Sequence, residues 1–190
     1  MRQIFLALLL AAACAAPTAG ARADPPHVQI VALGDSNIRG KGVAPDDAYP
    51  AQLERALRAH GHDVTITNEG VNGDTTFGVL ARLDSAVPAG TQLVILTVGR
   101  NDVVLHDQSE EIVAANKQEI ARQIRAKGAE VYVIEKMQQG LRDRYDLHVE
   151  AAPTPGRTDW HLNAAGYALA VQRTLPAIEA IVKRIERRAR

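Results

Sequence analysis

Short apolar or alternating runs recur along this chain, and longer amphipathic stretches separate them. Runs of this length, rich in β-branched residues, are typical of strands, and continuous ones indicate strands buried on both faces. Strands are predicted over residues 28–33, 63–68, 92–98 and 130–134. Helices are predicted over residues 49–60, 75–83, 109–127 and 163–187, the last one broken or kinked at Pro176.

The regular alternation of strands and helices determines the expected architecture. It predicts parallel strands joined by right-handed crossovers, with helices on both faces of the sheet. The fold class is therefore α/β, a three-layer αβα sandwich with a flavodoxin-like parallel sheet of four or five strands. Residues 145–149 supply the optional fifth strand. Ligands of such open sheets bind beyond the carboxyl ends of the strands, so candidate chemistry is sought there.

Small and polar residues gather at those strand ends. Three clusters directly follow the first three strands, and a fourth precedes the last helix. They are residues 34–37 (GDSN), 68–75 (NEGVNGDT), 99–102 (GRND) and 159–163 (DWHLN). Because the carboxyl ends of parallel strands meet at one edge of a sheet, these clusters are expected to lie together.

The four clusters contain the groups that acyl transfer requires. Ser36, at a strand-to-helix turn, presents a hydroxyl that becomes a strong nucleophile only when a base removes its proton. His161 is the candidate base, and Asp159 is the candidate carboxylate that orients its imidazole. Asp35 is interpreted as an acceptor that stabilises the turn.

A tetrahedral intermediate also needs hydrogen-bond donors for its negatively charged oxygen. The candidates are the backbone N–H groups of Ser36 and Gly73 and the side-chain amide of Asn101. Glycine at position 73 allows a close backbone approach. Asp102 is expected to bond the local backbone and shape its loop.

The same four clusters resemble the sequence blocks of the SGNH, or GDSL-type, hydrolase family. Ser36, Gly73, Asn101 and His161 supply its four letters in order. The sequence of residues 28–102 is similar to sequences of the bacterial arylesterase, lysophospholipase and acyl-thioesterase branch. The resemblance implies a serine hydrolase that cleaves carboxylic esters or thioesters of small to medium acyl groups through an acyl-enzyme. It implies no cofactor and no metal.

The last block departs from the family pattern. The family places an aspartate three residues before the histidine, where this chain has Thr158, and Asp159 stands two residues before. Either Asp159 reaches His161 through a shorter loop, or a Ser–His pair is oriented by a backbone carbonyl. The short segment between Met137 and His161 also implies a shallower or more open acyl pocket, or a differently built wall.

Two other functions fit the same residues. A carbohydrate O-deacetylase uses the same catalytic groups as an esterase acting on lipids. The displaced aspartate and the short segment before it also allow a binding protein with little activity on a hydrolase scaffold. An enzyme of either kind differs from a binding protein in that His161 must reach Ser36.

The N-terminal segment has the three parts of a secretory signal peptide. A positive start precedes an apolar stretch over residues 4–16, and Ala21-Arg22-Ala23 is a cleavage site. The expected organisation is a signal peptide over residues 1–23 and a hydrolase domain over residues 24–190, in a periplasmic or secreted protein. The alternative is a lipid anchor on Cys14. The apolar stretch is too short for a membrane span, so no stable membrane insertion is expected after cleavage.

Composition narrows the partners. With 190 residues, of which 46% are hydrophobic, the chain is expected to form one domain. Lys+Arg and Asp+Glu are 22 each and aromatic residues are 4%, which argues against a nucleic-acid partner. One cysteine excludes an internal disulfide framework. His60 and His62 lack a third ligand nearby in the sequence, so they are interpreted as a solvated turn. The expected partner is a small-molecule acyl ester or thioester, and the sequence does not indicate an oligomeric state.

Overall fold

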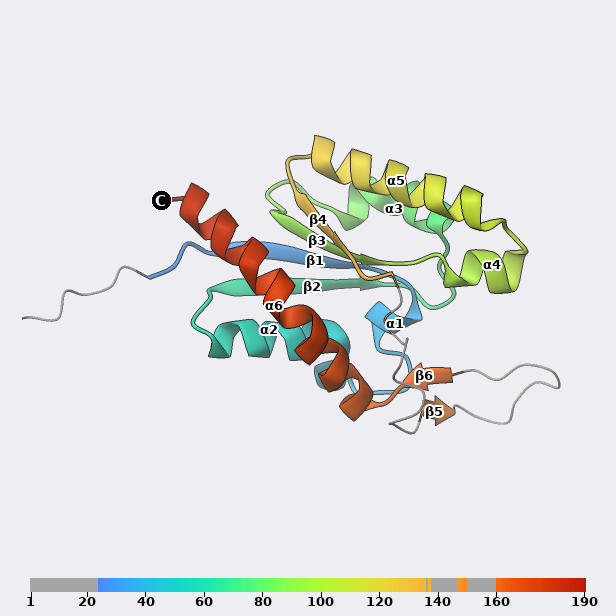
Figure 1. Ribbon diagram of the computed structural model, residues 1–190, viewed down its shortest axis with the longest axis horizontal. Coiled ribbons are helices and arrows are strands. Elements are labelled where there is room, and N and C mark those ends of the chain that lie inside the picture. The colour runs from blue at the N-terminus through green and yellow to red at the C-terminus, as the bar shows by residue number, and fades with distance from the viewer. Residues whose placement is uncertain (1–23, 136, 138–146, 150–159) are drawn as a thin grey trace, which may run out of the picture.

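A parallel four-stranded sheet lies between two layers of helices (Figure 1). The computed structural model describes residues 24–135, 137, 147–149 and 160–190. All strands of the sheet are parallel, in the order β2-β1-β3-β4, which confirms the expected fold class and matches the start of a flavodoxin-like sheet. The strands are β1 (Val28–Gly34), β2 (Val64–Gly70), β3 (Leu93–Thr97) and β4 (Glu130–Val133).

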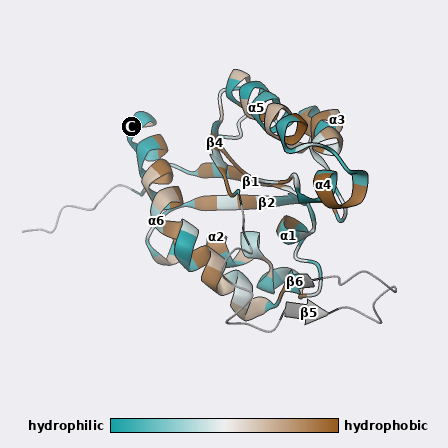
Figure 2. Cartoon of the chain, turned by 45° about the vertical axis from the view of Figure 1, so that its right-hand side comes forward, coloured by the Kyte–Doolittle hydropathy of each residue, from teal (hydrophilic) through white to brown (hydrophobic). Residues whose placement is uncertain are grey.

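Each face of the sheet is covered by one pair of helices. Helices α2 (Tyr49–Ala59) and α6 (Ala164–Arg188) cover one face, and α3 (Thr76–Ala86) and α5 (Glu110–Ala126) cover the other (Figure 1). Successive strand residues point to opposite faces. Ile30 therefore packs in the cluster with α2 and α6, while its neighbour Val31 packs in the cluster with α3 and α5. Burial on both faces explains why β3 is a continuous apolar run and β1 is apolar apart from Gln29. Brown segments mark the apolar residues of β1 in Figure 2.

Three short helical segments follow no periodic pattern in the sequence. Helices α1 (Ser36–Arg39) and α4 (Arg100–His106) begin directly after β1 and β3, and η1 (Pro45–Asp47) precedes α2. One or two turns are too short to display a hydrophobic period, so periodicity could not predict them. Both α1 and α4 begin inside the polar clusters at the strand ends.

The structure decides between four and five strands in the parallel sheet. The expected fifth strand exists as β5 (Leu147–Val149), but it pairs antiparallel with β6 (Trp160–Leu162) in a separate ribbon. Among the described residues the parallel sheet therefore has four strands, the first of the two expected alternatives, and residues 147–149 lie outside it. A parallel neighbour needs a long crossover, whereas these two short strands are close in sequence and pair directly.

The final helix, α6, is one unbroken helix. Asn163 caps α6, since its side-chain oxygen accepts from the backbone N–H of Gly166 at 2.9 Å. The helix continues through Pro176 without a break. No helix in the described ranges combines the length and apolar character needed to cross a membrane.

The order of the strands opens a crevice beside β1. The chain passes from β1 to β2 on one side and returns to β3 on the other, so the loops after β1 and β3 diverge. Gly34 ends β1 so close to β3 that a Cβ there would lie 2.0 Å from the carbonyl oxygen of Thr97. Glycine at this position brings the residue after next, Ser36, to the mouth of the crevice.

Candidate active site

Ser36 is the first residue of α1 and stands at the carboxyl end of β1. Asp35 caps this helix, because one carboxylate oxygen accepts from the backbone N–H of Asn37 at 2.9 Å and from its side-chain amide at 3.0 Å. The interpretation of Asp35 as a turn-stabilising acceptor is confirmed. The first N–H groups of a helix have no partner within it, so the Ser36 amide is suited to hold an anion.

His161 approaches Ser36 from the far end of the sequence. It lies on β6, and its Nε2 is 2.8 Å from Ser36 Oγ. Both side chains are nearly enclosed, with exposed fractions of 8% for Ser36 and 7% for His161. When the ring proton is on Nδ1, the hydroxyl donates to Nε2, which is the geometry that general-base activation of a serine requires.

The other two candidate residues lie close to each other. Asn101 is in the first turn of α4, and its side-chain amide donates to the carbonyl oxygen of Asp74 at 2.8 Å. That bond uses one amide hydrogen and sets the direction of the other. Gly73, next to Asp74, has φ of +77° in a turn closed by a bond from Asp74 N–H to Val71 carbonyl at 3.1 Å. The structure therefore places the side chain of Asn101 against the loop that carries Gly73.

A cavity of about 970 Å³ lies beside Ser36. It reaches Asp35 and Asn37 on either side of the serine, and it continues between α4, α5 and the end of β4. Its apolar floor includes Val98 and Val113. Ser36 and His161 do not line it, so the cavity lies beside the Ser–His contact rather than over it.

A family model described as the GDSL-like lipase/acylhydrolase family matches residues 32–154. The chain belongs to this family. The arylesterase of Vibrio mimicus is 32% identical over 108 residues, 56% of this chain and 54% of that protein. The esterase TesA of Pseudomonas aeruginosa is 30% identical over 109 residues, 55% of this chain and 52% of that protein. The chain thus spans about half the length of the curated relatives it matches. A solved variant of the esterase AlinE4 has a TM-score of 0.60 and 26% identity, covering 80% of this chain and 95% of that one.

A further component of this GDSL-like site is the residue that orients the imidazole of His161. Asp159 and Thr158 lie outside the described residues, so the choice between them stays a prediction. The strand that carries His161 is held by its ribbon, in which His148 is the cross-strand neighbour of His161.

An arginine that motif inspection did not single out stabilises the family's second block. Arg82 of α3 donates to the carbonyl oxygens of Gly34 at 3.2 Å and Glu69 at 2.9 Å. It also binds the carboxylate of Asp74 at 2.7 Å. One side chain therefore joins the ends of β1 and β2 to the loop that carries Gly73. Arg82 lies near the end of the helix predicted over residues 75–83, and only its position in the fold reveals its function.

A second network holds α4, and it extends beyond the local backbone. Asp102 is fully buried and accepts from the backbone N–H of Thr76 at 3.0 Å and from the Thr76 hydroxyl. Asn116 of α5 donates to the same hydroxyl at 2.8 Å. The Asp102 carboxylate therefore bonds a helix start 26 residues earlier, while its carbonyl oxygen accepts from the local backbone N–H of Gln108 at 3.0 Å.

Burial also changes the electrostatics behind the serine. It raises the pKa of the Asp35 carboxyl, against the lowering effect of the bonds from Asn37. The neighbouring Tyr167 of α6 is completely buried, and its hydroxyl has no hydrogen-bond partner in the described part of the structure. Burial first, and the Asp35 carboxylate second, raise the pKa of Tyr167.

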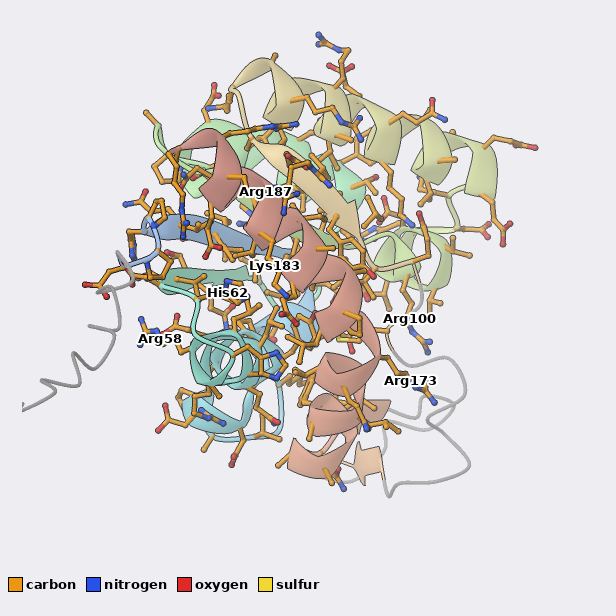
Figure 3. All side chains as sticks on the ribbon, turned by 60° about the vertical axis from the view of Figure 1, so that its left-hand side comes forward. Arg58, His62, Arg100, Arg173, Lys183 and Arg187 are labelled. Atoms are coloured by element: carbon orange, nitrogen blue, oxygen red, sulfur yellow. The ribbon has the colours of Figure 1, made fainter. Side chains whose placement is uncertain are left out.

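The interpretation of His60 and His62 as a solvated turn is wrong for His62. This ring is buried, its Nδ1 lies 2.8 Å from a Glu186 carboxylate oxygen, and Figure 3 shows it beneath α6 near Lys183. His60 is exposed and meets Glu179 at 3.0 Å. The carboxylates come from α6, more than a hundred residues away, so sequence spacing could not reveal them. No group of three or more His, Cys, Asp or Glu among the described residues is placed to hold a metal ion.

Replacing Asn101 with alanine should lower kcat by about 10²–10³ if its amide stabilises the oxyanion. The folded state loses only the bond to Asp74, which costs about 1 kcal/mol. Ester hydrolysis and urea unfolding of the same preparation separate the two effects. Loss of activity through unfolding instead would make Asn101 a structural turn residue.

The Asp102→Ala substitution should act on stability. It leaves the Thr76 N–H buried without its acceptor and should lower the free energy of unfolding by about 3 kcal/mol. Asp84→Ala, on an exposed position of α3, is the matched control and should change it little. Equal midpoints of urea unfolding for the two variants would contradict this assignment.

Proposed function

We propose that this chain is a serine hydrolase that cleaves carboxylic esters or thioesters of small to medium acyl groups through an acyl-enzyme on Ser36. The observation that carries the proposal is the 2.8 Å contact between Ser36 Oγ and His161 Nε2. A buried serine within hydrogen-bond reach of a histidine is the arrangement that nucleophilic catalysis needs. Membership of the GDSL-like lipase/acylhydrolase family supports the same chemistry.

The proposed reaction has two halves. Ser36 Oγ attacks the substrate carbonyl carbon while its proton passes to His161 Nε2, and the N–H groups of Ser36 and Gly73 and the Asn101 amide hold the oxyanion. The imidazolium then protonates the leaving alcohol or thiol, and the acyl-enzyme forms. A water molecule, deprotonated by the same ring, attacks the ester and releases the acid and free Ser36.

The cavity beside the Ser–His contact is proposed to receive part of the substrate. Its apolar floor suits an acyl chain, and Arg100 and Lys117 add charge at its border. Figure 3 shows Arg100 pointing outward from α4, and it is exposed. No cofactor or metal takes part in the proposed reaction.

Two measurements test this function. A fluorophosphonate probe should label Ser36, located by peptide mass spectrometry. A p-nitrophenyl ester series from acetate to longer acyl groups should be turned over and should report the preferred chain length. Labelling elsewhere would overturn the assignment of the nucleophile. A wild-type protein that hydrolyses none of the esters would favour the binding protein, and turnover of acetate alone would favour the O-deacetylase.

We further propose that the protein is exported and that residues 1–23 are removed. The support is the apolar stretch ending at Ala21-Arg22-Ala23. N-terminal sequencing of protein from the periplasm or medium should begin at Asp24. A start at a lipid-modified Cys14 would contradict this and make the protein membrane-anchored.

A further inference from the structure

The large apolar side chains that are exposed in the described part of the chain gather in one region. They belong to the loop after β2, the first turn of α3, helix α4 and the first turn of α5. We call them the apolar rim: Val71, Phe77, Val103, Val104, Leu105 and Ile112. Val104 and Phe77 are the most exposed, at 61% and 52%. Clustered exposed apolar residues indicate an interaction surface, whereas scattered ones do not.

Hydrogen bonds hold together the four segments that carry these side chains. Asn101 joins α4 to the loop after β2, Asp102 joins α4 to the start of α3, and Asn116 joins α5 to the same point. Figure 1 shows α4 at the end of the sheet where β1 and β3 finish, the end at which α1 begins. Figure 2 shows hydrophobic residues on both α3 and α4 there.

The rim leads into the cavity beside the proposed nucleophile. Val103 belongs to both, since it is exposed in α4 and also lines the cavity. The other five residues of the rim do not line the cavity, so they extend the apolar surface outward. Val103 therefore connects the rim with the cavity, so an acyl chain could pass along it from outside the protein to the neighbourhood of Ser36.

The connection between the rim and the cavity indicates which kind of partner covers the rim. A rigid protein partner, or a second copy of the chain, would close the access to the cavity. A lipid surface would instead deliver acyl chains to it. Residues 100–112 carry three exposed carboxylates, Asp107, Glu110 and Glu111, against one exposed arginine, Arg100. That charge balance disfavours an anionic surface and fits an uncharged or zwitterionic one.

We propose that the apolar rim docks this protein on an uncharged or zwitterionic lipid surface, and that its substrates include acyl esters presented by aggregated lipid. The proposal rests on the proposed function, because only an ester hydrolase gains substrate by docking there. Insertion of half-exposed side chains into the acyl region provides the favourable transfer free energy.

The docking step can be tested without turnover. The Ser36→Ala protein should co-sediment with phosphatidylcholine vesicles and bind vesicles rich in phosphatidylglycerol more weakly. Adding Val104→Ser and Phe77→Ser should lower the partition coefficient by about tenfold. Val104→Leu with Phe77→Leu is the matched control and should retain binding. Absent binding, or equal binding by the serine and leucine variants, overturns the proposal.

Kinetics of the otherwise wild-type protein separate docking from catalysis. The variant with Val104→Ser and Phe77→Ser, in which Ser36 is intact, should hydrolyse monomeric p-nitrophenyl acetate at the wild-type rate. It should hydrolyse lysophosphatidylcholine micelles about tenfold more slowly. Equal rates on micelles would contradict docking while leaving the hydrolase intact. Failure of the wild type on both substrates would overturn the proposed function instead. If the serine variant abolishes dimers in ultracentrifugation but not vesicle binding, the rim is a self-association surface and the proposal is wrong.

Discussion

Ser36→Ala is expected to lower kcat for p-nitrophenyl butyrate by roughly 10⁶, because the group that forms the acyl-enzyme is lost. The fold should persist, since a methyl group fits where the hydroxyl methylene stood. In the described part of the structure the Ser36 side chain hydrogen-bonds His161, so the substitution removes that bond without adding bulk. Steady-state assays with active-site titration measure the change.

Ser85→Ala is the matched control for this variant. The Ser85 hydroxyl is exposed on α3 and donates to the carbonyl oxygen of Arg82 at 2.9 Å. It should leave kcat and the melting temperature almost unchanged. Turnover by Ser36→Ala at the rate of the Ser85 variant would show that hydrolysis does not pass through Ser36.

The parts of the fold that the sequence predicts are those with a local signal. The apolar runs of β1 and β3 and the amphipathic period of α5 are visible within a dozen residues, and each element lies where it was expected, to within a few residues. Ser109 stands directly before α5 and caps it, since its side chain accepts from the N–H of Ile112 at 3.3 Å. The meeting of Ser36 and His161 followed from the motifs and the edge rule for parallel sheets.

The supports of the candidate site could not be predicted in the same way. Arg82 acts on Gly34, 48 residues earlier, and Asn116 acts on Thr76, 40 residues earlier. An arginine or an asparagine within an amphipathic helix has an ordinary local explanation, as a solvated polar residue. Their functions depend on which helix ends meet at the carboxyl edge of the sheet, which is a property of the packed layers.

The ribbon of β5 and β6 is a second feature that the sequence did not predict, and it affects the position of His161. A short strand near the end of an α/β sequence fits an edge position in the sheet equally well, so the sequence pattern left both four and five parallel strands open. In the structure the ribbon instead presents His161 to Ser36. The shortened segment before the histidine is thus compatible with a Ser–His contact, which removes one motive for an inactive binding protein.

His161→Ala should abolish turnover nearly as completely as loss of the serine, because the two groups act as a unit. His106→Ala, at the exposed end of α4, is the matched control and should retain activity. Activity should rise with pH as the imidazole loses its proton, since only the neutral ring accepts the serine proton. Ester hydrolysis by His161→Ala at the wild-type rate would eliminate it as the base.

The partner of the imidazole is then decided by two further variants. If Asp159 orients the ring, Asp159→Ala should lower kcat by roughly 10⁴, and Thr158→Ala should change it little. The carboxylate keeps the ring proton on Nδ1 and stabilises the imidazolium, so its loss affects the transition state more than substrate binding. KM should therefore change less than kcat. A wild-type rate for Asp159→Ala, with His161→Ala inactive, would instead establish a Ser–His dyad whose ring is held by another acceptor.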